Sequence, residues 1–398
     1  MDYRLFSSLP ESDRHRVWAE IDLDALRNNF RALRNMIQAK SPLTRAIAVV
    51  KADAYGHGSP ACVKALLDEG CDFFAVASVE EAVAVRKACD EKCRDATILI
   101  LGYTYPEYAE KLAVFRLTQT VLSSTYAEAL QKEAQKAGAT LSVHVVADSG
   151  MNRIGFACRS EEEIRRSAEE IREVCALPSL RVDGMFTHFA RADAYGTPDG
   201  RAFTDLQFSR YVALKTKLEE MGVKIPFHHV CNSAAAVFGK EELLDGVRFG
   251  ILLYGASPEI QNAISLTPVM KLKTIVSHLH TLPAGESVGY GGDFCADSER
   301  LIATLPIGYA DGFLRDYKGA SVQILHDGAR YSAKLVGRIC MDQCMADVTG
   351  LPVEEGDEVV LFGDTPDALS ALADQADTID YESLCLISAR VPRRYINQ

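Results

Sequence analysis

The first two thirds of the chain alternate between two hydrophobic patterns. Short apolar runs that are typical of buried strands occur at eight places, and segments with apolar residues at helical spacing lie between most of them. The strand-like runs cover residues 46–51, 73–77, 97–101, 117–122, 141–147, 182–188, 227–231 and 247–250. Helix starts are indicated by Ser59 with Pro60, by Thr125 with Glu128, and by Ser160 with Glu163.

Eight strands that alternate with helices predict an α/β fold, a parallel (β/α)8 TIM barrel. A doubly wound open sheet is the alternative. The barrel is favoured because no G-x-G-x-x-G opens a helix after a strand, and because polar, glycine-containing segments follow the strands at their carboxyl ends. A further strand-like run at 17–21 is left over.

The pattern changes after about residue 266, where strand-like runs follow one another and the next long helical pattern covers 366–377. A chain of 398 residues also exceeds the size at which a single core usually stops growing. We therefore expect a barrel domain over 14–266 and a mostly-β domain over 267–398. The β domain would be joined by residues 1–13 and possibly by the strand at 17–21.

Composition narrows the class of protein. The net charge of −12 argues against nucleic acids or anionic membranes as partners. The N-terminus lacks the features of a signal peptide, and no apolar run approaches the length of about 20 residues that spans a bilayer. The 11 scattered cysteines fit reduced thiols and a cytoplasmic protein. Their two C-x3-C pairs lack a second pair at zinc-like spacing, so no metal site is expected.

The first candidate for chemistry is Lys51, in the stretch AVVKADAYGHG at 48–58. An apolar strand ends at this lysine and a glycine-rich turn follows. A partly desolvated amine there can act as a base or as a nucleophile that forms a Schiff base. A lysine that merely ends a strand and points into water is the alternative.

A second candidate site follows the last two barrel strands, where barrels commonly bind phosphate. The segments are CNSAA at 231–235 and GILLYG at 250–255. Ser233 supplies a hydroxyl, and Gly250 exposes backbone N–H groups, although each alone is equally typical of a helix cap or a turn. A reactive lysine together with a phosphate site suggests pyridoxal 5'-phosphate.

The chain carries seven separated motifs: AVVKADAYGHG, SGMNRIG (149–155), HVCNSAA (229–235), GVRFGILLYG (246–255), SVGYGG (287–292), GRICMDQC (337–344) and ARVPRRY (389–395). Together they make the chain resemble the alanine racemase family, whose members are pyridoxal-phosphate enzymes with an N-terminal barrel and a C-terminal β domain. The resemblance extends from about Val17 to Tyr395.

The resemblance implies that Lys51 carries the cofactor covalently. It also implies a phosphate cradle and an arginine, Arg248, that faces the pyridine nitrogen of the cofactor. The cradle residues would be Tyr55, Ser233, Gly250, Ile251 and Tyr395. Since arginine keeps its proton near neutral pH, the ring nitrogen would stay unprotonated and the carbanion short-lived.

The family further implies two bases on opposite faces of the substrate, Lys51 and a tyrosine from the other subunit that corresponds to Tyr290. A homodimer with shared active sites follows from this. A free tyrosine has a pKa near 10, so His188 and Arg248 are the candidates that tune Tyr290. For the substrate, Arg153 matches the arginine on the carboxylate side and Met341 a backbone contact from the partner subunit. Cys340 and Asp342 flank Met341 and could be loop scaffolding.

One position departs from the family. Many members carry a carbamylated lysine that braces the arginine matching Arg153, and Val146 occupies that position here. Either an anion such as chloride or another side chain braces Arg153, or this arginine is held more loosely and the range of substrates differs.

Three alternatives to an alanine racemase stay open. They are a racemase of serine or another small amino acid, a barrel decarboxylase, and a non-catalytic pyridoxal-phosphate carrier. A decarboxylase is disfavoured because a second base such as Tyr290 has no role in decarboxylation. A carrier is disfavoured because such proteins resemble the barrel alone, whereas this chain also has a β domain.

Overall fold

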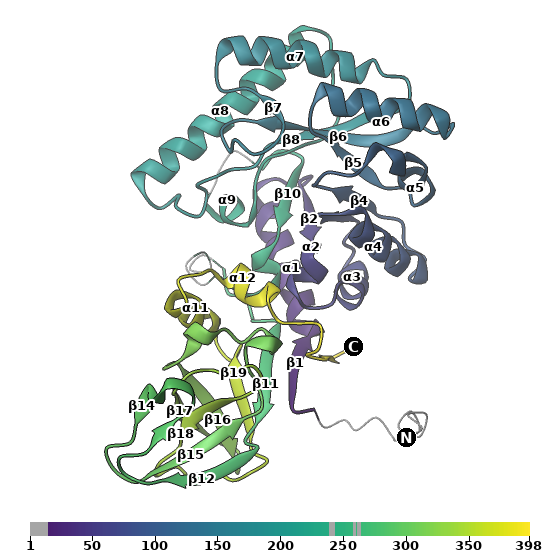
Figure 1. Cartoon of the computed structure of the whole chain (residues 1–398). Coiled ribbons are helices and arrows are strands. Elements are labelled where there is room, and N and C mark those ends of the chain that lie inside the picture. Colours follow the sequence, from purple (N-terminus) through teal and green to yellow (C-terminus); the bar gives the residue numbers. More distant parts are fainter. Residues whose placement is uncertain (1–14, 239–242, 258–259, 261–263) are drawn as a thin grey trace. The chain divides into compact units, whose positions relative to one another are not determined.

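The chain forms two structural units. The computed structural model describes residues 15–238, 243–257, 260 and 264–398. Of the described residues, one unit comprises those within Leu23–Thr267, and the other comprises residues 15–22 together with Pro268–Asn397 (Figure 1). Each unit is described by itself below.

The first unit is a closed barrel of eight parallel strands, which confirms the predicted TIM-barrel fold. The strands follow the order β5-β4-β3-β2-β10-β9-β8-β6, and pairing of β5 with β6 closes the ring. Their bounds are Arg45–Val49 (β2), Phe73–Val76 (β3), Thr97–Ile100 (β4), Thr118–Val121 (β5), Leu141–Asp148 (β6), Leu180–Phe186 (β8), His228–His229 (β9) and Gly246–Phe249 (β10). A short strand, β7 (Phe156–Ala157), pairs with the end of β6. All eight predicted runs are strands.

Helices surround these strands (Figure 1). They are α1 (Leu23–Lys40), α2 (Lys51–Tyr55), α3 (Ser59–Asp68), α4 (Val79–Glu91), η2 (Pro106–Tyr108), α5 (Ala109–Val114), α6 (Ser124–Lys136), α7 (Glu161–Cys175), α8 (Pro198–Glu220), α9 (Ser233–Phe238) and η3 (Ile251–Tyr254). The start predicted at Ser160 is confirmed, since its hydroxyl accepts from the N–H of Glu163 at 3.2 Å. The start predicted at Thr125 is wrong. Ser123 caps α6 instead and accepts from the N–H of Tyr126 at 3.2 Å.

The second unit is built on a nine-stranded sheet with the order β12-β15-β18-β17-β16-β19-β11-β1-β20. The strand predicted at 17–21 is β1 (Val17–Asp22), which pairs antiparallel with β11 and parallel with β20. The other strands are β11 (Met270–Ile275), β12 (His278–Leu282), β15 (Arg300–Leu305), β16 (Ser321–His326), β17 (Ala329–Val336), β18 (Cys344–Asp347), β19 (Glu358–Phe362) and β20 (Arg393–Ile396). A separate hairpin pairs β13 (Ser287–Val288) with β14 (Phe294–Cys295).

Short helical elements complete the second unit. These helical elements are η4 (Tyr290–Gly292), η5 (Tyr309–Asp311), η6 (Arg315–Tyr317), α11 (Pro366–Gln375) and α12 (Asp380–Cys385). The strands of the unit outnumber them, which agrees with the predicted mostly-β domain. The helix predicted over 366–377 is α11.

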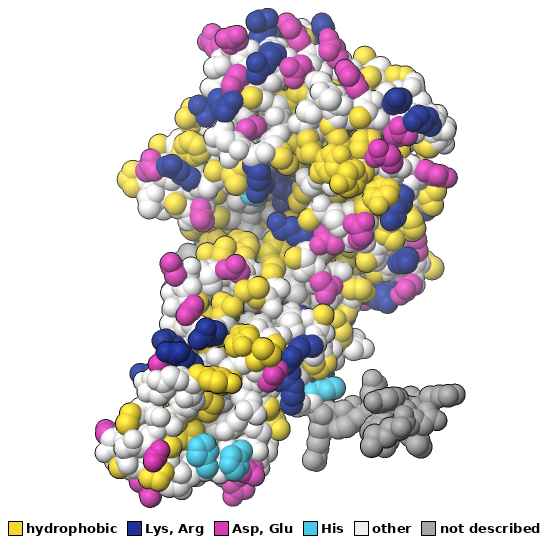
Figure 2. Space-filling model, in the orientation of Figure 1, with side chains coloured by type: hydrophobic (Ala, Val, Ile, Leu, Met, Phe, Trp, Pro, Cys, Tyr) yellow, Lys and Arg dark blue, Asp and Glu magenta, His cyan; other side chains and the backbone are white. Residues whose placement is uncertain are grey.

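Charged side chains of both signs are interspersed over the face of the molecule in Figure 2. This pattern matches a surface exposed to water. In the described part of the chain, no helix is long and apolar enough to cross a membrane.

Candidate active site

The lysine turn leaves β2 in an unusual conformation. Val50 separates half-buried Lys51 from the end of the strand. Residues 52–55 all have φ between 51° and 56°. This left-handed conformation costs non-glycine residues about 1–2 kcal/mol each. Gly56 and Gly58, with φ of 80° and 90°, complete the turn without that cost. Such strain is typical of functional sites and requires support from the surrounding structure.

Glu81 supplies part of that support from the first turn of α4. One of its carboxylate oxygens, Oε1, accepts from the N–H of Ala52 at 2.7 Å, and the other, Oε2, accepts from the N–H of Ala77 at 2.7 Å. Asp53 adds a second brace, since its Oδ1 accepts from the N–H of Ser59 at 2.7 Å. The lysine turn is therefore tied to the loop after β3 and to the start of α3.

Aromatic rings hold the far side of the same turn. The ring of Tyr55 packs on Tyr254 with centroids 4.9 Å apart, and His57 stacks on Tyr254 at 4.5 Å. Tyr254 in turn donates its hydroxyl to the carbonyl of Val49 at 3.0 Å. The three rings fix the position of Tyr55 relative to the end of β2.

The two predicted phosphate residues after β9 and β10 contact each other. The N–H of Gly250 donates to Oγ of Ser233 at 2.9 Å. A Cβ at Gly250 would lie 2.5 Å from Oη of Tyr55, so only glycine leaves room for the tyrosine hydroxyl here. Ser233, Gly250 and Tyr55 are thus adjacent, and Ile251 begins η3 beside them.

Arg248 is buried on β10, and its guanidinium is held on four of its five N–H groups. Nη1 donates to Nδ1 and to the carbonyl of His229, both at 2.8 Å. Nη2 donates to the carbonyls of Thr187 at 2.8 Å and Val230 at 3.0 Å. Among the described residues, Nε alone has no hydrogen-bond partner. A single oriented donor is therefore left for a ligand.

A histidine pair continues from Arg248 through the barrel. Because arginine only donates, Nδ1 of His229 accepts, and the proton of this imidazole lies on Nε2. Nε2 lies 3.0 Å from Nδ1 of His144, to which it donates. Burial, with the charge of Arg248, holds the pKa of His229 well below its usual range, so the ring is neutral. The proton of neutral His144 is then on its Nε2.

His188 and Arg153 bring further polar groups toward Arg248. Nδ1 of His188 lies 3.3 Å from Nη2 of Arg248. Burial, followed by the positive charges of Arg248, Arg153 and Lys51, lowers the pKa of His188 to about 3. His188 is therefore neutral at pH 7, while the three cations around it attract an anion.

Arg153 itself is exposed, and none of the described side chains forms an ion pair or hydrogen bond with its guanidinium. Val146, at the position of the family's bracing lysine, is buried in β6 with 3% of its surface exposed.

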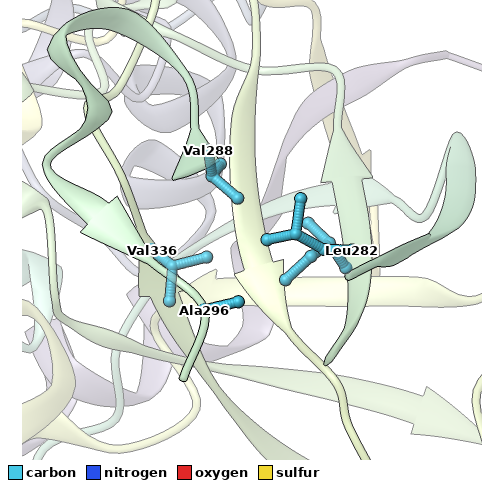
Figure 3. Packing of buried hydrophobic residues seen from close by; sticks show 5 residues of the cluster. Leu282, Val288, Ala296 and Val336 are labelled. Atoms are coloured by element: carbon cyan, nitrogen blue, oxygen red, sulfur yellow. The ribbon is translucent and has the colours of Figure 1, made fainter. Parts of the chain in front are cut away.

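Tyr290 lies in the second unit, at the tip of the β13–β14 hairpin, and its side chain is 72% exposed. The hairpin packs on an apolar cluster of Leu282, Val288, Ala296, Ile302 and Val336 (Figure 3). Arg338 covers the tip. Its guanidinium lies 2.9 Å from the position that a Cβ of Gly291 would take, and it pairs with Asp293 at 2.7 and 2.9 Å. The tyrosine is thus exposed on a well-supported loop.

Met341 is held through its backbone in the same unit. The N–H groups of Tyr309 and Ala310 donate to the carbonyls of Cys340 at 3.1 Å and Met341 at 3.0 Å. Asp342 pairs with Arg390. These contacts hold the backbone of the loop that carries Met341. Tyr395 lies in β20 opposite Ile21 of β1.

The barrel unit brings together Lys51, Tyr55, Arg153, His188, Ser233, Arg248, Gly250 and Ile251. Tyr290, Met341 and Tyr395 belong to the β-rich unit, and their place at the site stays a prediction. Sequence patterns assigned no role to His229, Tyr254 or Glu81. His229 and Tyr254 lie inside the motifs HVCNSAA and GVRFGILLYG, and this position was the sequence feature that could have identified them. Glu81 lies in none of the seven motifs, so no feature of the sequence indicated its role.

The fold and the site define a class of protein: a TIM-barrel enzyme that holds a strained lysine beside anion-binding groups and carries a second, β-rich domain. Comparison with known proteins gives the family. The alanine racemase N-terminal domain matches residues 21–258, and the alanine racemase C-terminal domain matches residues 269–395. The chain belongs to the alanine racemase family.

Relatives match over nearly their whole length. The alanine racemase of Methanococcus maripaludis is 40% identical over 96% of this chain and 99% of its own. That of Clostridium perfringens is 41% identical over 95% of both chains. Among solved structures, alanine racemase of Clostridium difficile 630 has a TM-score of 0.86 at 38% identity and covers 97% of both chains. Alanine racemase of Bacillus anthracis with bound L-Ala-P has a TM-score of 0.84 at 32% identity, over 97% of this chain and 96% of that one.

Proposed function

We propose that this protein is a pyridoxal-phosphate-dependent racemase that interconverts L- and D-alanine and supplies D-alanine for cell-wall peptidoglycan. One observation carries the proposal. The strained Lys51 turn, the Ser233–Gly250–Tyr55 contact and the single unused donor of Arg248 occur in one barrel whose relatives are named alanine racemase.

The residues fit the cofactor. Tyr55, Ser233 and the backbone at Gly250 and Ile251 would hold its phosphate, with Tyr395 as a further contact. Lys51 would bind its aldehyde carbon. The Nε–H of Arg248 would donate to the ring nitrogen, because its other N–H groups are engaged. Bound pyridoxal phosphate would withdraw electrons from the amino acid and so make its Cα proton acidic.

The residues of the chain would then move that proton. Nζ of Lys51 removes or returns it on one face, and Oη of Tyr290 of the partner subunit does so on the other. Arg153 orients the substrate carboxylate, and the backbone at Met341 of the partner completes the pocket. His188 would tune the pKa of Tyr290 through a hydrogen bond, and Arg248 through its positive charge. This scheme requires a homodimer, and the eleven cysteines, all present as thiols, support a cytoplasmic location.

The proposal is tested by isotope exchange and spectroscopy. Purified wild type is expected to be yellow, to lose its visible band on borohydride reduction, and to exchange the Cα proton of L-alanine with deuterated water. Lys51→Ala should lack the band, and Tyr290→Phe should keep the band but lose racemisation. A band in Lys51→Ala, or undiminished racemisation in Tyr290→Phe, would contradict the assignment. Rates for alanine, serine and larger amino acids decide the preferred substrate.

A further inference from the structure

Helix α8 carries a polar side chain on its buried face. The buried residues follow helical spacing. They are Gly200, Thr204, Gln207, Tyr211, Leu214 and Leu218. Gln207 is fully buried, with none of its surface exposed. Glutamine is seldom buried in this way, because its amide must replace the hydrogen bonds that it gives up to water. The partners of the Gln207 amide are therefore informative.

The amide of Gln207 joins the loops that follow two barrel strands, β6 and β8. Oε1 accepts from the N–H of Ala190 at 2.8 Å. Nε2 donates to the carbonyl of His188 at 3.1 Å and to Oγ of Ser149 at 3.3 Å. Because the oxygen faces a donor and the nitrogen faces acceptors, the orientation of the amide is fixed. A methyl or methylene group of the same size could fill this space but could not join the two loops.

Ser149 is the first residue of the loop that carries Arg153. Its Oγ lies 2.8 Å from Oγ1 of Thr187, and one hydroxyl donates to the other. The carbonyl of Thr187 accepts from Nη2 of Arg248 at 2.8 Å. The first residue after β6 is therefore tied to the first residue after β8, and through that residue to Arg248.

The loop after β6 also lies close against α8. A Cβ at Gly150 would lie 3.1 Å from Nη1 of Arg210 and 3.5 Å from Cγ of Gln207. Nη1 of Arg210 donates to the carbonyl of Ser149 at 3.0 Å. Gly150 has a φ of 140°, which favours glycine. Gln207 and Arg210, one helical turn apart, thus hold the base of this loop from the same side.

We propose that Gln207 is a positioning residue of the racemase site. It fixes the base of the Arg153 loop relative to the segment that carries His188. The separation between the Arg153 guanidinium, which orients the substrate carboxylate, and the His188 imidazole depends on this arrangement. Gln207 has no chemistry of its own in the reaction, so its role rests on the proposed function of Arg153 and His188.

Gln207→Met tests this role, because methionine has a similar volume but no amide. For alanine, kcat/KM should fall about 10- to 100-fold, since a displacement of about 1 Å can cost about 100-fold. The visible band of the holoenzyme and its retention on dialysis should match wild type. Lys51, Ser233 and Gly250 follow other strands and keep their contacts.

Gln131→Met is the matched control. Gln131 is a buried glutamine on α6, and its Oε1 accepts from the N–H of Ser179 at 2.8 Å. Ser179 lies just before the first residue of β8, so this contact is at the opposite end of the barrel strands. Gln131→Met should keep the wild-type kcat/KM, and circular dichroism checks the fold of both variants. An equal fall of kcat/KM in the two variants, or no fall in Gln207→Met, would overturn the proposal.

A double-variant cycle tests whether Gln207 acts through Ser149. Ser149→Ala removes the hydroxyl that accepts from the amide and contacts Thr187. The double variant Gln207→Met with Ser149→Ala should lose less kcat/KM than the product of the two single losses, because both changes break one network. Single losses that multiply would contradict the role of Gln207 in this network.

Hydrogen exchange followed by mass spectrometry requires no turnover, so it separates the role of Gln207 from the proposed function. Peptides that cover residues 149–155 and 187–190 should exchange faster in Gln207→Met than in wild type or Gln131→Met. Unchanged exchange in these peptides would overturn the role of Gln207. If exchange changes as expected but wild type does not racemise alanine, the proposed function alone is wrong.

Discussion

Nη1 of Arg248 lies 2.8 Å from Nδ1 of His229 and donates to it. This contact fixes the tautomer of His229, and through it that of His144, so the orientation of Arg248 depends on a neutral imidazole pair inside the barrel. The acceptors that fix the direction of the remaining Nε–H of Arg248 are an imidazole nitrogen and backbone carbonyls, and no carboxylate is among them. A carboxylate in place of His229 would neutralise the charge of Arg248. It has no N–H, however, so it could not donate a hydrogen bond to Nδ1 of His144 as His229 does.

His229→Phe should therefore impair both stability and catalysis. Phenylalanine keeps the stacking on Phe186, whose ring centroid lies 4.8 Å away, but leaves a buried guanidinium N–H without this acceptor. The free energy of unfolding should fall by about 1–3 kcal/mol, and kcat should fall while the cofactor band remains. Urea unfolding and steady-state rates measure this. His278→Phe is the control, because His278 is exposed in the β-rich unit. An unchanged unfolding free energy in His229→Phe would contradict the argument.

Glu81→Ala should loosen the strained lysine turn without touching the substrate. The variant removes acceptors from the N–H groups of Ala52 and Ala77, both at 2.7 Å. Displacement of the Lys51 amine by about 1 Å is expected to lower kcat between about 10- and 100-fold. Glu80→Ala is the matched control, since Glu80 is an exposed neighbour in the same helical turn. Equal rates in the two variants would show that the turn holds its conformation without Glu81.

The sequence was sufficient to predict features that depend on local pattern. All eight barrel strands were predicted because each is a short apolar run. Lys51, Ser233 and Gly250 were selected as candidates because they follow strand ends, and their roles stay predictions. The contacts of Glu81 and the His144–His229–Arg248 chain could not be predicted, since they join residues 29 and 85 positions apart or connect different strands. The helix start at Ser123 was missed because Thr125 offered an equally good cap two residues later.

Gly250→Ala should weaken cofactor binding. The new Cβ would lie 2.5 Å from Oη of Tyr55 and must displace that side chain. The cofactor is expected to dissociate more readily on dialysis, followed by its visible absorbance. Gly196→Ala is the control, because no atom lies within 4 Å of the position that a Cβ would take there. Cofactor retention equal to wild type would rule out the tight fit at Gly250.

Gly308→Ala should affect turnover but not the cofactor. A Cβ here would meet the carbonyls of Cys340 at 2.3 Å and Met341 at 2.5 Å, so the loop that carries Met341 must move. Because the barrel residues are unchanged, the visible band should match wild type while kcat/KM for alanine falls. Gly196→Ala again controls for added bulk. A normal kcat/KM would show that the loop position does not matter to the reaction.

Asp311→Asn should change how stability depends on pH. Burial raises the pKa of this carboxyl, but the ion pairs with Arg16 and Arg390 and the N–H of Gly308 outweigh burial, and the pKa is lowered overall. A group whose folded pKa is lowered contributes stability above its unfolded pKa, about 3.9, and loses it as pH falls through the folded value. Wild type should therefore exceed Asp311→Asn in unfolding free energy at pH 7, and the gap should shrink below about pH 4. Thermal or urea unfolding of both proteins between pH 7 and pH 3 measures the gap, and Asp327→Asn, at an exposed turn, is the control. A gap that stays constant over this range would show that the Asp311 carboxylate carries no net ion-pair stabilisation.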